Sequence, residues 1–323
     1  MMKAPYISIL LLGLALGCES TMDYPVIQDE GKFYLECFPS SATDSTLLVL
    51  HRTHPINKPR EAYDWNHVQV HLSINGTPVE WAKSYDYGNG ILLKTPTVPA
   101  EGDQLTVSIQ DEGHSPIVAH SSVPTAPRFT YTREITPQWD DRYHILLERE
   151  DKGKREYFGV LLEGKHRHKT VFPDGRIEIT EDAIPNLYYS VNGTYNISIS
   201  DETEGRFRMV SVAGQQMFLF EVKEGEDNPF ILNVDTETAE DRPEWLHIDI
   251  PTKRSTLFRV TLFRISQSAY RFLAPKENES LSGAGLISPF DVQGNLMDAF
   301  GMFDCMGGDS TEWEFSLSSS SGV

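Results

Sequence analysis

Short runs of branched and aromatic residues, separated by turn signals, recur along this chain and favour a β fold. Clear examples occupy residues 46–50, 68–74 and 104–109, and the last two alternate apolar with polar residues. A period of two places the apolar side chains on one face of a strand. Asn75-Gly76, after the second run, is the strongest hairpin signal, because both residues tolerate positive φ. The pattern predicts a mostly β protein.

The strand runs divide into two groups. Turn signals recur at the spacing expected of a β-sandwich over residues 31–126, and a segment with two prolines at 121–127 marks a boundary. Further runs predict a second β-rich domain over residues 127–315. Within it, residues 266–274 carry the one short helical pattern, while the Ser-rich residues 316–323 are expected to form a disordered tail.

The first residues carry the features of a bacterial lipoprotein signal peptide. Apolar residues 7–16 follow Lys3, and small residues come directly before Cys18. This arrangement predicts cleavage after residue 17 and lipid on Cys18. A membrane-spanning helix is the alternative, but the apolar run of ten residues is short of the roughly 20 that a bilayer needs. Residues 18–30 are polar and are expected to form a tether.

The chain is acidic, with a formal net charge of -19. Removing residues 1–17 takes away Lys3 and no acidic residue, so the mature chain is still more negative. Such a charge argues against nucleic acid as a partner, because phosphate binding needs a basic surface. Attachment to a membrane would therefore depend on the lipid at Cys18.

Two cysteines remain once Cys18 carries lipid. Cys37 and Cys305 lie near opposite ends of the chain, and in an oxidising envelope they could form a disulfide. The alternative is two separate, buried and unreactive thiols. No pattern of a known cysteine hydrolase surrounds either residue.

Two local patterns are candidate binding sites. His166 and His168 alternate in a predicted strand, so both imidazoles could face one metal ion, although the interleaved basic residues favour a solvated basic strand instead. Trp139, Asp140 and Asp141 could form a ligand rim, because an aromatic face beside carboxylates suits sugars or cations. The alternative for Trp139 is a loop side chain that caps the sandwich edge. No cofactor is expected.

Motifs of familiar enzymes are absent from the sequence. It contains no GxSxG, Ser-x-x-Lys, HExxH or CxxC pattern and no phosphate-binding loop. We therefore expect a protein that binds rather than an enzyme.

The order of several short motifs is similar to that of a known family. The motifs are Cys18 and residues 49–55, 262–266, 289–295 and 300–303. In this order the chain resembles the DUF4249 family of Bacteroidetes outer-membrane lipoproteins. Asp298-Ala299 stands where the resemblance leads us to expect glycines at a tight turn.

The resemblance implies an outer-membrane lipoprotein encoded near a TonB-dependent receptor. With the lipid anchor and the β-sandwich loops, it favours a binding protein that is accessory to such an uptake receptor. The alternatives are a structural or adhesive surface lipoprotein and an envelope hydrolase whose site carries no recognised motif.

Overall fold

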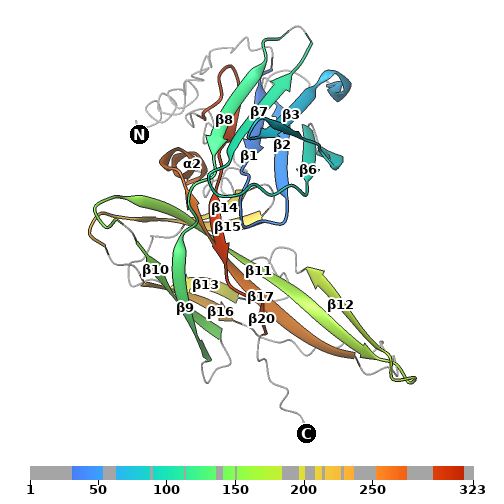
Figure 1. Cartoon of the computed structure of the whole chain (residues 1–323), viewed down its shortest axis with the longest axis vertical. Coiled ribbons are helices and arrows are strands. Elements are labelled where there is room, and N and C mark those ends of the chain that lie inside the picture. Colours follow the sequence, from blue (N-terminus) through green and yellow to red (C-terminus); the bar gives the residue numbers. More distant parts are fainter. Residues whose placement is uncertain are drawn as a thin grey trace, which may run out of the picture.

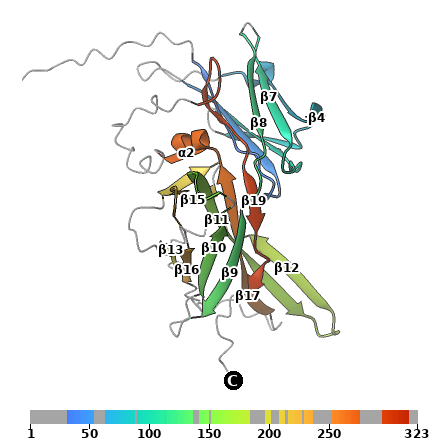
Figure 2. The same ribbon diagram turned by 60° about the vertical axis from the view of Figure 1, so that its left-hand side comes forward.

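The computed structural model contains two β-sandwiches stacked along the long axis of the molecule, with a short helix beside their junction (Figures 1 and 2). The mostly β fold predicted from the sequence is confirmed. The structure describes residues 31–53, 63–87, 90–112, 114–135, 141–149, 151–183, 196–200, 208–212, 215–226, 229–235, 252–274 and 294–315. The predicted signal peptide, Cys18, most of the tether and the Ser-rich tail lie outside these residues.

The first sandwich packs a five-stranded sheet, in the order β18-β1-β2-β6-β5, against a four-stranded sheet, in the order β4-β3-β7-β8. Strand β18 (Phe300–Phe303) comes from the far end of the chain. Its elements from the first part of the chain are β1 (Phe33–Cys37), β2 (Thr46–Arg52), the 3-10 helix η1 (Trp65–His67), β3 (Gln69–Ile74), β4 (Thr77–Val79), β5 (Lys83–Tyr87), β6 (Gly90–Thr95), β7 (Gln104–Gln110) and β8 (Ile117–Ser122).

Apolar side chains that alternate along each strand with polar ones fill the core of this sandwich. In β7 the apolar Leu105, Val107 and Ile109 are buried, while the polar residues between them lie further out. The hairpin between β3 and β4 turns at Asn75 and Gly76, whose φ angles of 51° and 78° are those of a type I′ turn. The hairpin signal in the sequence is thus confirmed.

A strand from the far end of the chain completes the first sandwich. β18 (Phe300–Phe303) pairs in parallel with β1, and Met302 and Phe303 are fully buried. Gly301 has a φ of 104°, and a Cβ placed there would lie 1.8 Å from the carbonyl oxygen of Leu35. Just before the strand, Asp298 adopts φ 61°, so it takes the left-handed conformation for which glycine was expected.

The second sandwich packs a four-stranded sheet, in the order β13-β16-β10-β9, against a larger sheet in the order β14-β15-β11-β17-β19. In the larger sheet, β12 also pairs with β11, and β20 also pairs with β17. Its elements are β9 (Arg128–Ile135), β10 (Asp141–Glu148), β11 (Glu156–Val171), β12 (Ile177–Ala183), β13 (Asn196–Ser200), β14 (Arg208–Val212), β15 (Gln215–Val222), β16 (Pro229–Asp235), β17 (Thr252–Ile265), β19 (Gly307–Ser310) and β20 (Glu314–Phe315).

The central strands β11 and β17 are buried on both faces along part of their length. Phe158, Val160 and Leu162 enter the core between the two sheets, while Tyr157 and Leu161 pack on the opposite face. That burial explains why these strands read as nearly continuous apolar runs. The second face packs against the helix α2 (Gln267–Leu273) and against first-sandwich residues such as Phe38 and Met302, so one core joins the two sandwiches.

The helix α2 forms where the sequence predicts it. Ser266 is its N-cap and accepts a hydrogen bond from the backbone N–H of Ala269 at 3.0 Å. Ala269, Phe272 and Leu273 are buried. None of the described helices is long and apolar enough to cross a membrane.

The chain passes from the first to the second sandwich through residues 123–127, the segment in which the sequence places a boundary. Val123 is buried and donates to the carbonyl of Asp103 at 2.9 Å. The carbonyl of Thr125 accepts from Arg264 at 3.2 Å. β18 comes from the sequence range assigned to the second domain, yet it pairs with the first sandwich.

Candidate functional site

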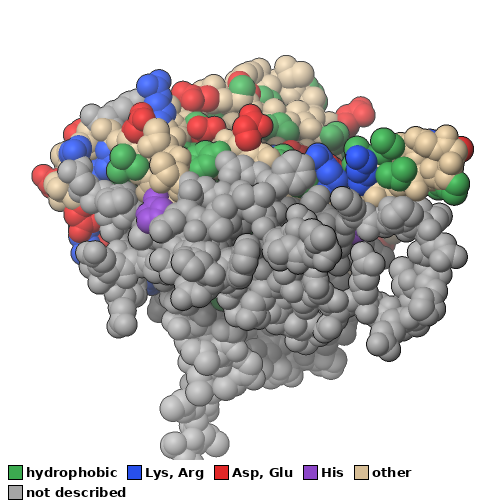
Figure 3. All heavy atoms as spheres, turned by 90° about the horizontal axis from the view of Figure 1, so that it is seen from below, with side chains coloured by type: hydrophobic (Ala, Val, Ile, Leu, Met, Phe, Trp, Pro, Cys, Tyr) green, Lys and Arg blue, Asp and Glu red, His purple; other side chains and the backbone are tan. Residues whose placement is uncertain are grey.

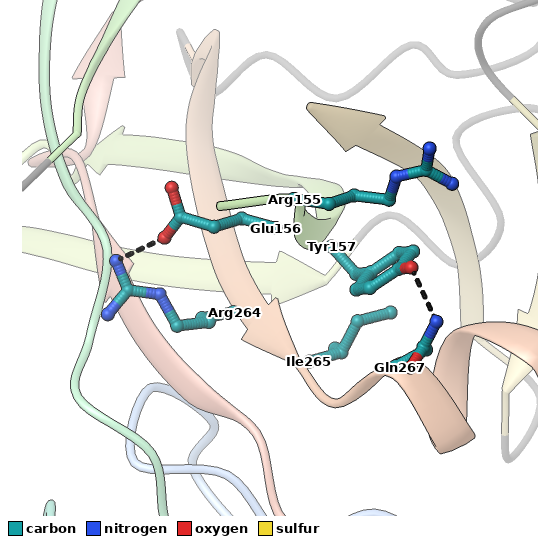
Figure 4. Close-up of a pocket in the computed structure, with 6 residues that line it drawn as sticks. All are labelled: Arg155, Glu156, Tyr157, Arg264, Ile265 and Gln267. Atoms are coloured by element: carbon teal, nitrogen blue, oxygen red, sulfur yellow. Dashed lines mark hydrogen bonds and ion pairs between the residues drawn. The ribbon is translucent and has the colours of Figure 1, made fainter. Parts of the chain in front are cut away.

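A surface pocket opens where β11 begins, β17 ends and α2 starts (Figure 4). Its volume is about 460 Å³, within the usual range of ligand sites. Six residues line it: Arg155, Glu156, Tyr157, Arg264, Ile265 and Gln267. Alternate residues of a strand point to opposite sides, so Glu156 faces away from Arg155 and Tyr157 (Figure 4).

Glu156 is held between two arginines. Its carboxylate oxygens lie 2.9 Å from Nε of Arg149 and 3.2 Å from Nη2 of Arg264. Arg149 is only 2% exposed and also donates to the carbonyls of Lys223 and Glu226, at 3.0 and 2.7 Å. Arg149 therefore fixes the turns around the site, and Glu156 has its charge already paired.

The opposite side of the pocket presents donors that are less engaged. The Arg155 guanidinium is 54% exposed, and its Nη1 lies 3.6 Å from Glu221, longer than a charge-assisted hydrogen bond. The Tyr157 hydroxyl accepts from Nε2 of Gln267 at 2.9 Å, which leaves its own proton to donate. The Tyr157 ring is fixed by the ring of Tyr270, 4.9 Å away between centroids. This arrangement suits a ligand with anionic or hydroxyl oxygens.

Sequence reasoning missed this pocket. Arg155, Tyr157 and Gln267 carry no motif. The three residues come from the start of one strand and from a helix more than a hundred positions later. No local spacing could reveal that they meet.

Of the predicted rim, Trp139 and Asp140 lie outside the described residues. Asp141 begins β10, where its backbone pairs with Ile135 and Val234. The ligand rim therefore stays a prediction.

His166 and His168 both lie in β11, opposite Asp182 and Thr180 of β12. The side chain of His166 lies outside the described part of the structure, so a metal site shared by the two histidines stays a prediction. Across the described ranges, no three or more His, Cys, Asp or Glu residues form a group that could hold a metal ion.

Cys37 and Cys305 lie in the core of the first sandwich, and both thiols are free. Burial raises the pKa of Cys37 well above its usual value, and the nearby Cys305 and Glu36 add to this effect. Burial also raises the pKa of Cys305 to about 12, although its hydrogen bond with Ser121 opposes the change. Thiols that stay protonated are poor nucleophiles. A disulfide between the two stays a prediction.

Asp304 connects the helix α2 to strand β8. One carboxylate oxygen accepts from the Ser121 hydroxyl of β8 at 2.7 Å, and the other accepts from Ser266, the N-cap of α2. The helix that carries Gln267 is thereby tied to the first sandwich.

Comparisons with known proteins give one extensive match. A family model described as "Domain of unknown function (DUF4249)" matches residues 19–312. No curated protein matches the chain.

Among solved structures, the adhesin InvE of Yersinia pseudotuberculosis is 9% identical, with a TM-score of 0.19; the alignment covers 71% of this chain and 54% of the adhesin. This chain thus spans about half the length of that adhesin. SGBP-B, from a complex xyloglucan utilization locus in Bacteroides uniformis, is 9% identical, with a TM-score of 0.21 and coverages of 62% and 71%.

Proposed function

This chain belongs to the DUF4249 family, and from that premise we propose that it is a lipid-anchored binding protein of the bacterial outer membrane, accessory to a TonB-dependent uptake receptor. The anchor rests on Cys18 and the signal peptide before it. Lipid at Cys18 would connect to the first sandwich through residues 18–30, which leaves the rest of the body accessible to a partner.

The pocket formed by the start of β11, the end of β17 and the start of α2 is the observation that carries the binding role. It offers the exposed guanidinium of Arg155, the hydroxyl proton of Tyr157 and the amide of Gln267. A guanidinium and a phenol pair well with a carboxylate, and an amide pairs with hydroxyl groups. We infer that its ligand is a small polar solute that carries a carboxylate beside hydroxyls.

Calorimetric titration of the soluble protein with galacturonate tests this inference, with neutral methyl galactoside as the control ligand. We expect galacturonate to bind and Arg155→Gln to weaken its binding about tenfold, because a hydrogen bond to a charged group is lost. Tyr157→Phe removes a single neutral donor and should weaken binding about fivefold.

Lys154→Gln is the matched control, since Lys154 is 77% exposed and does not line the pocket. It should leave galacturonate binding unchanged. Equal binding of the neutral galactoside, or equal binding by wild type and Arg155→Gln, would contradict the proposal that this pocket binds a carboxylate ligand.

A further inference from the structure

The hairpin of β11 and β12 projects from the second sandwich (Figures 1 and 2). β11 pairs with β15 over residues 156–160 and with β12 only from residue 165 onward. On the other side of β11, β17 runs alongside as far as Thr252. Within the described part of the chain, β12 therefore has β11 as its single neighbour and forms an edge of the sheet.

The backbone of β12 has polar groups that point away from β11. At the turn of the hairpin, the N–H of Phe172 donates to the carbonyl of Arg176 at 2.8 Å. Hydrogen-bonded pairs alternate along an antiparallel ladder, so Glu178 and Thr180 bond to β11. The N–H and C=O groups of the residues between them, Ile177, Ile179 and Glu181, then point away from β11. An added strand could form hydrogen bonds with these groups.

The side chains of this edge form two rows of different chemistry. On one face, Val171, Ile177 and Ile179 are 38%, 55% and 57% exposed. They are neighbours, because Val171 lies directly opposite Ile177. Three of the eight large hydrophobic side chains that are exposed among the described residues thus lie on one hairpin. Seen from below, hydrophobic side chains emerge beside Lys and Arg at the right-hand end of the described surface (Figure 3).

The other face of β12 carries a carboxylate. Glu178 is exposed there, on the face opposite to Ile177 and Ile179. At the turn, the guanidinium of Arg176 lies over the ring of Phe172, 4.1 Å from its centroid. On the apolar face, Lys165 and Arg167 each pair with Glu181 at 2.6 Å. Lys169, opposite Ile179, also lies on that face. A strand added to β12 would therefore meet isoleucines on one side and the carboxylate of Glu178 on the other.

We propose that β12 receives an extended segment of a partner protein in which apolar and basic residues alternate. The apolar residues pack on Ile177 and Ile179, and the basic residues lie across from Glu178, because opposite charges on neighbouring strands attract. A second copy of this chain would bring a second Glu178 and a further charge of -19, so the charges favour a basic partner. The proposal depends neither on the lipid anchor nor on the pocket.

Fluorescence polarisation with a labelled peptide that alternates valine and lysine tests the proposal, and a valine–glutamate peptide is the control. We expect the soluble protein to bind the first peptide and not the second. Glu178→Lys should weaken binding about tenfold, by exchanging an attractive for a repulsive pair. The substitution is on the surface, so the fold should be unaffected.

Ile179→Pro tests the hydrogen bonding of the β12 edge most directly. Proline removes one N–H, and at residue 179 this donor faces the added strand rather than β11. The variant should keep its circular dichroism spectrum and bind the peptide about tenfold or more weakly, while Ile179→Val should bind like wild type.

Equal binding of both peptides, no binding of the valine–lysine peptide, or unchanged binding by Glu178→Lys would overturn the proposal. A concentration-dependent dimer that Ile179→Pro abolishes would overturn it too, because the edge would then serve a second copy. If Ile179→Pro fails to fold, Glu178→Lys still decides.

Discussion

Gly301→Ala is expected to destabilise the protein by about 3 kcal/mol. The new Cβ would lie 1.8 Å from the carbonyl oxygen of Leu35, and alanine disfavours a φ of 104°. β18 would have to move away from β1, and Met302 and Phe303 would lose part of their burial. Both sandwiches depend on this contact, since Phe303 belongs to one core and Met302 to the core at the junction.

Urea unfolding of the soluble form checks this expectation, with Gly76→Ala as the matched control. Gly76 also has a positive φ, 78°, but nothing lies within 4 Å of its added Cβ. Its substitution should therefore cost only the strain of the left-handed conformation, about 1 kcal/mol. If the two variants lost the same stability, the close approach of β18 to β1 would not be a major source of stability.

Cys18→Ala is expected to release the protein from the membrane completely. An acyl chain attaches only to the cysteine, and the chain after the signal peptide is acidic, so once residues 1–17 are removed no other predicted anchor would hold it to an anionic bilayer. After fractionation, wild type should pellet with outer membranes and incorporate labelled palmitate, whereas Cys18→Ala should remain in the supernatant. Membrane pelleting by both, together with no acyl label on wild type, would rule out the lipid anchor.

Local patterns in the sequence predict much of the fold. Leu105, Val107 and Ile109 identify the inward face of β7 because their spacing matches the pleat of a strand. Asn75-Gly76 identifies a hairpin, and Ser266 with the apolar residues after it identifies α2. In each case the signal and the structure involve residues that are neighbours in the chain.

Contacts between distant residues were not predictable. Nothing near Gly301 indicates that its strand pairs with β1, some 265 positions earlier, because parallel pairing leaves no turn to detect. The pocket is hidden for the same reason: Tyr157 and Gln267 meet only after β11 and β17 have paired. Histidine and acidic pairs, by contrast, are visible in the sequence, but in a chain with 47 acidic residues such pairs arise by chance.

Purification of the native lipoprotein from outer membranes tests the proposed accessory role most directly. Mild detergent extracts should yield a stable complex with one outer-membrane β-barrel, identified by mass spectrometry as a TonB-dependent receptor. Deleting the lipoprotein gene should then impair growth on that receptor's substrate alone. Recovery of the lipoprotein as a single species, with no growth defect on any substrate of a neighbouring receptor, would contradict the account and favour a structural role on the cell surface.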